Sequence, residues 1–269
     1  MLAKQRQARI LEVLAEKGAV RVTELVDAFG VSDMTIRRDL DFLSELGKLN
    51  KVHGGATRVD LSAAAEPGFT AKKVREQAEK TAIAKTAASY VKPGQAIAIS
   101  AGTTTWMMAQ QLADTPQLTV VTNSIPVADV FYRNGRADQT VILTGGIRTP
   151  SDALVGPFAV NSLTTINVDT VFLGVHGMSL ESGFTTPNLM EAETLTAFSQ
   201  KGRNLIVLAD HTKWKTVGLA TIARLEDADA VITDSRMDLE TQETIDELTE
   251  LVVAPLDGDE SGEGAPPSD

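Results

Sequence analysis

Apolar residues recur at helical spacing through the first fifty residues and gather in short runs after residue 95. The early spacing predicts three helices, each with one apolar face. They cover about Lys4–Lys17, Val22–Phe29 and Ser32–Leu46. A short extended link at Ala19–Arg21 joins the first two, and Gly30 supplies the tight turn before the third. Helix, short helix, glycine turn and helix is the order of a helix-turn-helix.

The third predicted helix separates an apolar stripe from a polar surface. Ser32 suits the N-cap, and Asp33 follows where the positive end of the helix dipole favours an acid. The stripe consists of Ile36, Leu40 and Leu43. The other side chains are Met34, Thr35, Arg37, Arg38, Asp41 and Glu45. A helix that buries one side and offers Ser, Thr and two arginines suits the major groove of DNA, because arginine pairs bidentately with guanine or phosphate.

A second explanation of the same side chains is structural. Arg37 and Asp41 are spaced for an i, i+4 ion pair. Two adjacent arginines on a helix are also more often a solvated face than a binding surface. The residues around the helix must therefore decide between the two explanations.

The segment that follows, Lys48–Ala56, alternates weakly and turns on two glycines, which predicts a β-wing. Lys48 and Lys51, together with Arg58, would reach phosphates beside the groove. The alternative is a solvated hairpin with no role in binding.

The distribution of charge agrees with a DNA-reading segment at the N-terminus. The whole chain has a formal net charge of -11, which by itself argues against a nucleic-acid partner. Residues 1–58, however, hold ten Lys and Arg against eight Asp and Glu, whereas the remainder has a net charge of -13. Such a mildly basic module would depend on local placement of charge and on dimerisation for its affinity.

The N-terminal region carries three spaced motifs: Val-Ser-x-x-Thr-Ile-Arg-Arg-Asp-Leu at Val31–Leu40, Leu-x-x-x-Gly at Leu43–Gly47, and His-Gly-Gly-Ala at His53–Ala56. With these motifs, the segment from Arg6 to Ala56 resembles the DNA-binding domain of the DeoR family of bacterial transcriptional regulators. So many spaced matches are specific, unlike a lone charged helix. The resemblance implies that the residues facing DNA are Ser32, Thr35, Arg37 and Arg38, with His53 in the wing.

The body of the chain reads as an α/β domain. Residues 59–70 lack periodicity and predict a connector, and Lys72–Val91 reads as one helix. Short apolar strands then alternate with helices near 104–113, 125–134, 188–201 and 240–249, which predicts an open sheet with helices on both faces. The predicted strands are Ala96–Ser100, Leu118–Thr122, Thr140–Thr144, Asp169–Gly174, Asn204–Ala209 and Ala230–Thr233.

Ligands of open α/β sheets bind beyond the carboxyl ends of the strands. The first predicted strand runs into Gly102-Thr103-Thr104-Thr105, where glycine, helix amides and Thr hydroxyls suit an anion. A Thr-capped helix start explains the same residues equally well. Several strand ends carry small, polar or charged residues, which favours a shared cleft over a set of unrelated caps. The other candidates are Asn123, Gly145, Gly146, Arg148, Gly177, Asp210 and Lys213.

The body also resembles the DeoR C-terminal sensor domain, over about Arg75 to Asp234, which is similar in fold to ribose-5-phosphate isomerase and glucosamine-6-phosphate deaminase. By that resemblance, the Gly-Thr-Thr loop holds the phosphate of a sugar or related metabolite, and Glu191 and Glu193 belong to the site. Two departures are Ser100, included in the site, where relatives usually have Asp, and Leu195, where they often have Lys. Losing that acid and base weakens the case for catalysis.

The composition excludes several classes of function. With no cysteine in the chain, disulfides and thiolate chemistry are ruled out. The three histidines, His53, His176 and His211, have no metal-ligand spacing, so we expect neither metal nor cofactor. No signal peptide or membrane span is evident, which predicts a soluble cytoplasmic protein with no membrane partner.

We therefore expect a winged helix-turn-helix at 1–58, a linker at 59–74, an effector-sensing α/β domain at 75–254 and a disordered acidic tail at 255–269. The resemblance implies a DNA-binding repressor of carbohydrate genes, controlled by a phosphorylated sugar and not an enzyme. Two half-sites in double-stranded operator DNA would need a homodimer or higher homo-oligomer. The alternatives are a phosphosugar isomerase or deaminase with a DNA-binding appendage, and a nicotinamide-binding domain, which the missing Gly-x-Gly-x-x-Gly disfavours.

Overall fold

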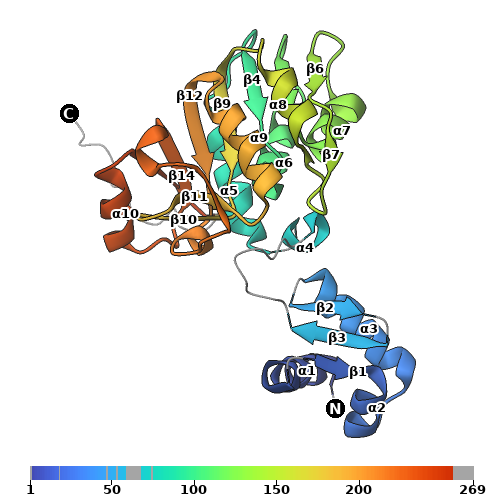
Figure 1. Ribbon diagram of the computed structural model, residues 1–269. Coiled ribbons are helices and arrows are strands. Elements are labelled where there is room, and N and C mark those ends of the chain that lie inside the picture. Colours follow the sequence, from blue (N-terminus) through green and yellow to red (C-terminus); the bar gives the residue numbers. More distant parts are fainter. Residues whose placement is uncertain are drawn as a thin grey trace, which may run out of the picture. The chain divides into compact units, whose positions relative to one another are not determined.

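The computed structural model describes residues 2–17, 19–46, 48–52, 54–58, 68–73 and 75–256. The chain divides into two compact units, Met1–Arg75 and Glu76–Asp269 (Figure 1). The predicted wing residue His53, most of the predicted linker and the tail from residue 257 lie outside the described residues. Among those described, no helix is long and apolar enough to cross a membrane.

The first unit is a winged helix-turn-helix, as the sequence predicts. Three helices pack with a three-stranded antiparallel sheet of order β1-β3-β2, and their side chains enclose one apolar cluster that includes Ile10, Leu25, Ile36 and Leu40. The elements are α1 (Ala3–Lys17), β1 (Ala19–Arg21), α2 (Val22–Phe29), α3 (Asp33–Glu45), β2 (Leu49–Val52), β3 (Gly55–Arg58) and α4 (Phe69–Lys73).

Local chemistry sets the limits of α3, the predicted recognition helix. The Ser32 side chain accepts the backbone N–H of Thr35 at 3.3 Å, as an N-cap does. Ile36, Leu40 and Leu43 are buried in the apolar cluster, so the stripe fixes the inward face. Asp39 is also buried, where it pairs with Arg6 of α1 at 2.5 Å.

The segment between the units differs from the prediction. Instead of one helix over Lys72–Val91, there are α4 and a separate α5 (Gln77–Ala88). Glu76, which precedes α5, has φ 45° and ψ 48° and therefore cannot continue a right-handed helix. Arg75 stays with the first unit, where its Nε donates to the Leu46 carbonyl oxygen at the end of α3, at 3.1 Å.

The second unit is built on a seven-stranded parallel sheet of order β15-β14-β12-β9-β4-β5-β6 (Figure 1). The six predicted strands are all present, and a seventh, β15, was missed. Its strands are β4 (Ala96–Ile99), β5 (Thr119–Thr122), β6 (Thr140–Leu143), β9 (Val168–Gly174), β12 (Gly202–Leu208), β14 (Ala230–Asp234) and β15 (Glu250–Ala254).

Helices cover both faces of this sheet, which confirms the predicted fold class. One apolar cluster includes side chains of α5, α6 and α7, and the other includes side chains of α8, α9 and α10. The predicted helix at 125–134 matches α7, whereas the others end earlier than predicted. The helices are α6 (Thr103–Gln111), α7 (Ile125–Asn134), α8 (Pro157–Leu163), α9 (Leu189–Ser199) and α10 (Leu239–Asp246).

Two small antiparallel additions lie outside the main sheet, and the sequence pattern did not predict them. A hairpin follows β6, and a three-stranded sheet of order β10-β11-β13 lies farther along the chain. They consist of β7 (Ile147–Arg148), β8 (Leu154–Val155), β10 (Gly177–Ser179), β11 (Gly183–Thr186) and β13 (Ala220–Ala223). Strands of two to four residues give too little alternation to be recognised in a sequence.

Candidate functional site

The exposed side of α3 carries the candidate DNA-binding residues. Ser32, Arg37 and Arg38 are exposed and Thr35 is half-buried, whereas the apolar stripe is turned inward. Ser32 Oγ also lies 2.9 Å from Thr35 Oγ1, so these two hydroxyls are hydrogen-bonded to each other. The structure therefore brings the four residues to one end of one helix, on its solvent side.

The two arginines differ in their partners. Arg37 pairs with Asp33 at 2.5 Å, and the hydrogen bond with Asp33 raises the pKa of this guanidinium above its usual value. The expected pair of Arg37 with Asp41 is wrong, because Asp41 instead binds Lys51 of the wing. Arg38 is exposed and has no ion-pair or hydrogen-bond partner within the described part of the chain. Arg38 is therefore the arginine whose whole fork is available to a base.

The wing supplies two further cations. Lys48 is exposed at the end of α3, with no partner among the residues that the structure describes. Lys51 is exposed on β2, and its ammonium binds Asp41 of α3, so this pair ties the wing to the helix. Lys51 would have to break its pair with Asp41 before it could contact a phosphate, whereas Lys48 could contact a phosphate without losing a partner.

The second candidate site lies at the carboxyl edge of the sheet, where β4 leads into α6. Gly102 is the N-cap of α6, and the first free amides of this nine-residue helix follow it. Thr105 donates its hydroxyl to the carbonyl oxygens of Ser100 and Gly102, at 2.8 and 3.1 Å. Its hydroxyl is therefore used by the loop itself and is not available to an anion.

Thr103 and Thr104 differ from Thr105 in this respect. Both residues are nearly buried, at 6% and 7% exposure, yet their hydroxyls have no hydrogen-bond partner in the described part of the chain. Neither hydroxyl oxygen is among the buried unpaired atoms of the described residues, so both reach solvent beside the helix start, where they are available to a ligand. This observation favours an anion site over a Thr-capped helix start.

Two predicted ligand residues hold the loop instead of facing outward. Ser100 is fully buried, and its Oγ accepts the backbone N–H of Gly174 at 2.9 Å, which ties β4 to β9. Asn123 is also fully buried, accepting from the Ala101 N–H at 2.8 Å and donating to the Leu154 carbonyl oxygen at 3.2 Å. Both side chains therefore hold the backbone at and near the Gly-Thr-Thr loop through hydrogen bonds.

The turn after β6 is tightly built. Gly145 and Gly146 have φ of 73° and 125°, values that side-chain-bearing residues rarely adopt. A Cβ on Gly146 would also lie 2.6 Å from the Val155 carbonyl oxygen. Arg148, predicted as an anion ligand, binds Asp152 across the β7–β8 hairpin at 2.6 Å. Its guanidinium is therefore already paired.

Of the next three candidates, Glu191, Glu193 and Gly177, only Glu191 has a buried polar side chain. Glu191 is buried in the first turn of α9 and accepts the Thr186 hydroxyl at 2.8 Å. Glu193 is exposed two positions later, and residues two apart do not share a helix face. Gly177 is needed for packing, since a Cβ there would lie 2.0 Å from the Thr216 carbonyl oxygen.

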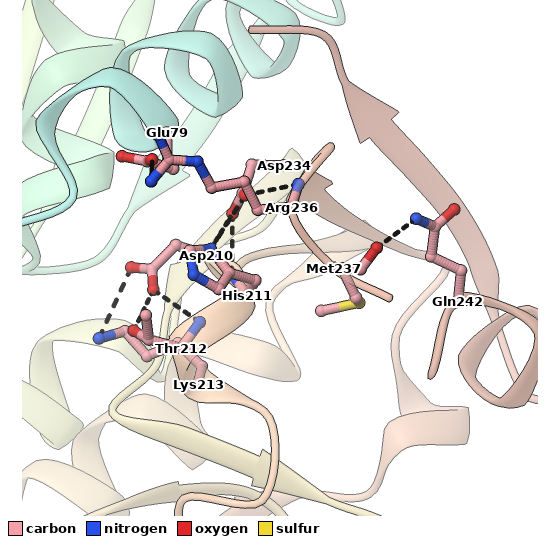
Figure 2. Close-up of polar contacts among 9 residues, drawn as sticks. All are labelled: Glu79, Asp210, His211, Thr212, Lys213, Asp234, Arg236, Met237 and Gln242. Atoms are coloured by element: carbon pink, nitrogen blue, oxygen red, sulfur yellow. Dashed lines mark hydrogen bonds and ion pairs between the residues drawn. The ribbon is translucent and has the colours of Figure 1, made fainter. Parts of the chain in front are cut away.

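Asp210 and Lys213 present a charged pair beyond β12 (Figure 2). Asp210 is fully buried, and its Oδ1 accepts the backbone N–H of Thr212 at 3.1 Å and also binds the Thr212 hydroxyl. Its Oδ2 lies 3.6 Å from Lys213 Nζ and has no hydrogen-bond partner in the described part of the chain. A buried carboxylate oxygen without a donor, beside a half-exposed ammonium, suits a ligand with a hydroxyl and an anionic group.

Sequence reasoning missed the residues behind this pair. The backbone N–H and Nδ1 of His211 lie 2.8 and 3.0 Å from the oxygens of buried Asp234, at the end of β14. Asp234 also accepts the Arg236 N–H at 3.1 Å, and Arg236 Nη1 lies 2.5 Å from Oε1 of buried Glu79 on α5 (Figure 2). Asp234 follows an apolar strand, so the strand-end rule should have identified it. Nothing in the sequence pairs Glu79 with Arg236.

The described residues hold no group of three or more His, Asp or Glu side chains that could bind a metal. The carboxyl edge of the sheet carries helix amides and two free Thr hydroxyls after β4, and the Asp210–Lys213 pair after β12, with β9 between these two strands.

Comparison with known proteins identifies a family for each part of the chain. Residues 6–61 match a profile described as the DeoR-like helix-turn-helix domain, and residues 75–235 match the DeoR C-terminal sensor domain. The chain is 35% identical to an uncharacterized HTH-type transcriptional regulator, YulB, of Bacillus subtilis, covering 95% of this chain and 98% of the relative. It is also 35% identical to the HTH-type transcriptional regulator GlpR of Haloferax volcanii, covering 94% and 98%.

Among solved structures, ribose 5-phosphate isomerase A from Methanocaldococcus jannaschii is similar over 51% of this chain and 54% of that chain, with a TM-score of 0.37 and 14% identity. The two curated relatives are named as transcriptional regulators, and neither is named as an enzyme. Their alignments span both units of this chain, so they include the helix-turn-helix and the sheet edge together.

Proposed function

Because the chain belongs to the DeoR family of helix-turn-helix transcriptional regulators, we propose that it represses genes of carbohydrate metabolism under the control of a phosphorylated sugar. Two copies of α3 would read the half-sites of double-stranded operator DNA, which requires a homodimer or larger assembly. The sensor domain would hold the effector at the carboxyl edge of its sheet. Such a regulator acts in the cytoplasm, where the operator is.

The observation that carries this proposal is the set of unpaired groups at the sheet edge. The hydroxyls of Thr103 and Thr104 and the amides of α6 would hold the phosphate. Lys213 would neutralise it, and Asp210 Oδ2 would accept a sugar hydroxyl. A phosphorylated sugar supplies a phosphate and separate carbon-bound hydroxyls, whereas a plain sugar lacks the phosphate and inorganic phosphate lacks the carbon-bound hydroxyls.

The experiment that tests the function is binding to DNA from upstream of the protein's own operon, at fixed salt, with and without a panel of sugar phosphates. We expect saturable, sequence-specific binding that one compound weakens. Specific binding that no phosphosugar changes would contradict the effector and leave the regulator. Absence of specific binding, together with turnover of a sugar phosphate, would instead support an isomerase or deaminase.

Thr104→Ala should blunt the effector response and leave operator affinity unchanged without effector. A hydrogen bond to a charged group contributes about 1.5–3 kcal/mol, so the effector should bind roughly 10- to 150-fold more weakly. Isothermal titration of the effector measures this directly. Thr244→Ala is the matched control, because its hydroxyl binds the Glu240 carbonyl oxygen within α10. An unchanged response in Thr104→Ala would remove the Gly-Thr-Thr loop from the effector site.

The junction between the units suggests how effector binding reaches DNA. On one side, Arg75 donates to the Leu46 carbonyl oxygen at the end of α3. On the other, α5 begins at Gln77, and its Glu79 binds Arg236, which is linked through Asp234 to the Asp210 turn. A movement of that turn would therefore act on the first helix after the junction.

Glu79→Gln should uncouple the two activities. The variant loses the charge that holds Arg236, so effector affinity should persist while its effect on operator affinity shrinks by about 2- to 30-fold, or roughly 0.5–2 kcal/mol of coupling. The measurement is operator affinity with and without saturating effector. Glu226→Gln, which removes the partner of Arg224 in an exposed pair, is the control. Coupling equal to that of the unchanged protein would exclude the Glu79–Arg236 contact as the route.

A further inference from the structure

Strand β6 is exposed in a way that a strand of a parallel sheet ordinarily is not. It is an edge strand, and all four of its residues are exposed, with Val141, Ile142 and Leu143 at 36%, 37% and 44%. Parallel sheets are normally covered on both faces. At the opposite edge, β15 has only its first residue exposed. An unprotected apolar edge of this kind is a site for pairing with another chain.

The exposed side chains of β6 point to both faces of the sheet. In the register with β5, Val141 lies opposite Val120 and Ile142 opposite Val121. Val120 and Val121 belong to different apolar clusters, one on each face. Because registered residues in a parallel pair point to the same side, β6 is apolar on both. Among the described residues no strand pairs with its outer edge.

A second copy of this chain fits the edge better than an unrelated partner. An edge strand that pairs antiparallel with its own copy gives a two-fold, closed dimer. Helix α7 packs beside β6 (Figure 1). It exposes the pair Asp129–Arg133, and the pair Arg136–Asp138 follows the helix. Surfaces that carry both signs in such alternation can meet their own copy with opposite charges facing.

Two exposed side chains extend the apolar surface beyond the strand itself. Tyr132 of α7 is 89% exposed, and Ile147, just after the glycine turn, is 54% exposed. Tyrosine is enriched in protein interfaces. Because four strand residues alone bury too little area for a stable dimer, such neighbours are needed to complete it.

We propose that the outer edge of β6, with α7 beside it, is the surface on which a second copy of this chain docks, the two β6 strands running antiparallel. This inference rests on the proposed function in that two recognition helices call for a dimer. The strand continues into Gly145 and Gly146 at the effector edge, where a Cβ on Gly146 would strike Val155. In the sheet, β5 lies between β6 and β4, the strand that leads into the Gly-Thr-Thr loop.

Light scattering of the full chain after size exclusion tests the surface. We expect the unchanged protein to have at least twice the mass of one chain, which is 28.7 kDa, and Ile142→Lys to halve that mass. Leu180→Lys is the matched control, because Leu180 is 57% exposed but lies between β10 and β11. Thermal melts show that both variants fold. A dimer that persists in folded Ile142→Lys would overturn the surface.

The absence of cysteine allows a second, milder test. Cysteine is placed singly at Val141, Ile142 and Leu143, which covers registers in which a residue lies opposite its own copy. A double variant with cysteine at Val141 and Ile142 covers a register in which each of these residues lies opposite the other. We expect oxidation to give a disulfide-linked dimer in at least one variant and none with Leu180→Cys, since Cβ atoms must approach to about 4 Å.

The two tests separate the surface from the proposed function. No cross-link, together with a dimer that still binds operator, would overturn docking at β6 and leave the regulator. An unchanged protein that is monomeric and binds no operator would overturn both.

Discussion

Asp39→Ala should destabilise the N-terminal unit by about 3–5 kcal/mol and abolish operator binding, although the Asp39 side chain is buried. Asp39 is 4% exposed and binds Arg6 Nε at 2.5 Å, while Gln7 donates to its other oxygen at 2.9 Å. Removing one partner of a buried pair leaves the other charge uncompensated, which costs that amount. A unit of this size has about that much stability in total, so most of it would unfold.

The matched control for this prediction is Glu12→Ala. Glu12 binds Arg9 at the same 2.5 Å, but their side chains are 58% and 63% exposed. An exposed pair contributes about 0–1 kcal/mol, so this variant should be almost unchanged. Equal losses in Asp39→Ala and Glu12→Ala would show that burial does not decide the contribution of these pairs.

The placement of tryptophan separates the two units in the measurement. Both tryptophans, Trp106 and Trp214, lie in the second unit, so their fluorescence follows the sensor domain alone. We expect the fluorescence transition in denaturant to be unchanged in Asp39→Ala. Hydrogen exchange of the amides of α3 should instead become fast, because it follows local opening of the first unit.

Elements with strong local signals were predicted closely from the sequence. Helix α7 begins after Ser124, whose side chain accepts the Val127 N–H, and Pro126 lies in its first turn. Helix α2 ends at Gly30, which has φ 63°. Capping and turn residues act over three or four positions, so they are visible in the sequence itself.

Elements whose limits depend on distant contacts were predicted less well. The helix break at Glu76 involves neither glycine nor proline, and helix-forming residues lie on both sides of it. The residues on either side of the break contact residues distant in the sequence: Arg75 donates to Leu46, and Glu79 binds Arg236. Such contacts override local propensity and leave no periodic pattern behind.

At the candidate sites, too, contiguous motifs were predicted from the sequence, whereas the partners of each side chain were not. The Gly-Thr-Thr loop is contiguous and was predicted, but only the structure separates the engaged hydroxyl of Thr105 from the unpaired hydroxyls of Thr103 and Thr104. Likewise, both arginines of α3 were predicted as DNA-binding residues, and only their partners distinguish them. Sequence gives the residue types at a site, whereas the choice among them depends on neighbours in space.

Arg38→Ala should weaken operator binding by about 1–3 kcal/mol, roughly 5- to 150-fold, and leave binding to unrelated DNA nearly unchanged. Arg38 is exposed, with no partner within the described part of the chain, so its fork can pair bidentately with guanine. Arg37 must first give up Asp33, and we expect Arg37→Ala to cost less than Arg38→Ala.

Lys48→Ala provides the contrast that makes this prediction specific. Lys48 is exposed and without a partner in the described chain, and a phosphate contact there carries no sequence information. Its loss should weaken operator and unrelated DNA alike and reduce the slope of log affinity against log salt by about 1. If Arg38→Ala instead loses equal affinity on both DNAs, Arg38 is also a phosphate contact. Recognition of the DNA sequence would then have to come from Ser32 and Thr35. Their hydroxyls would break the hydrogen bond between them and bind the edge of a base.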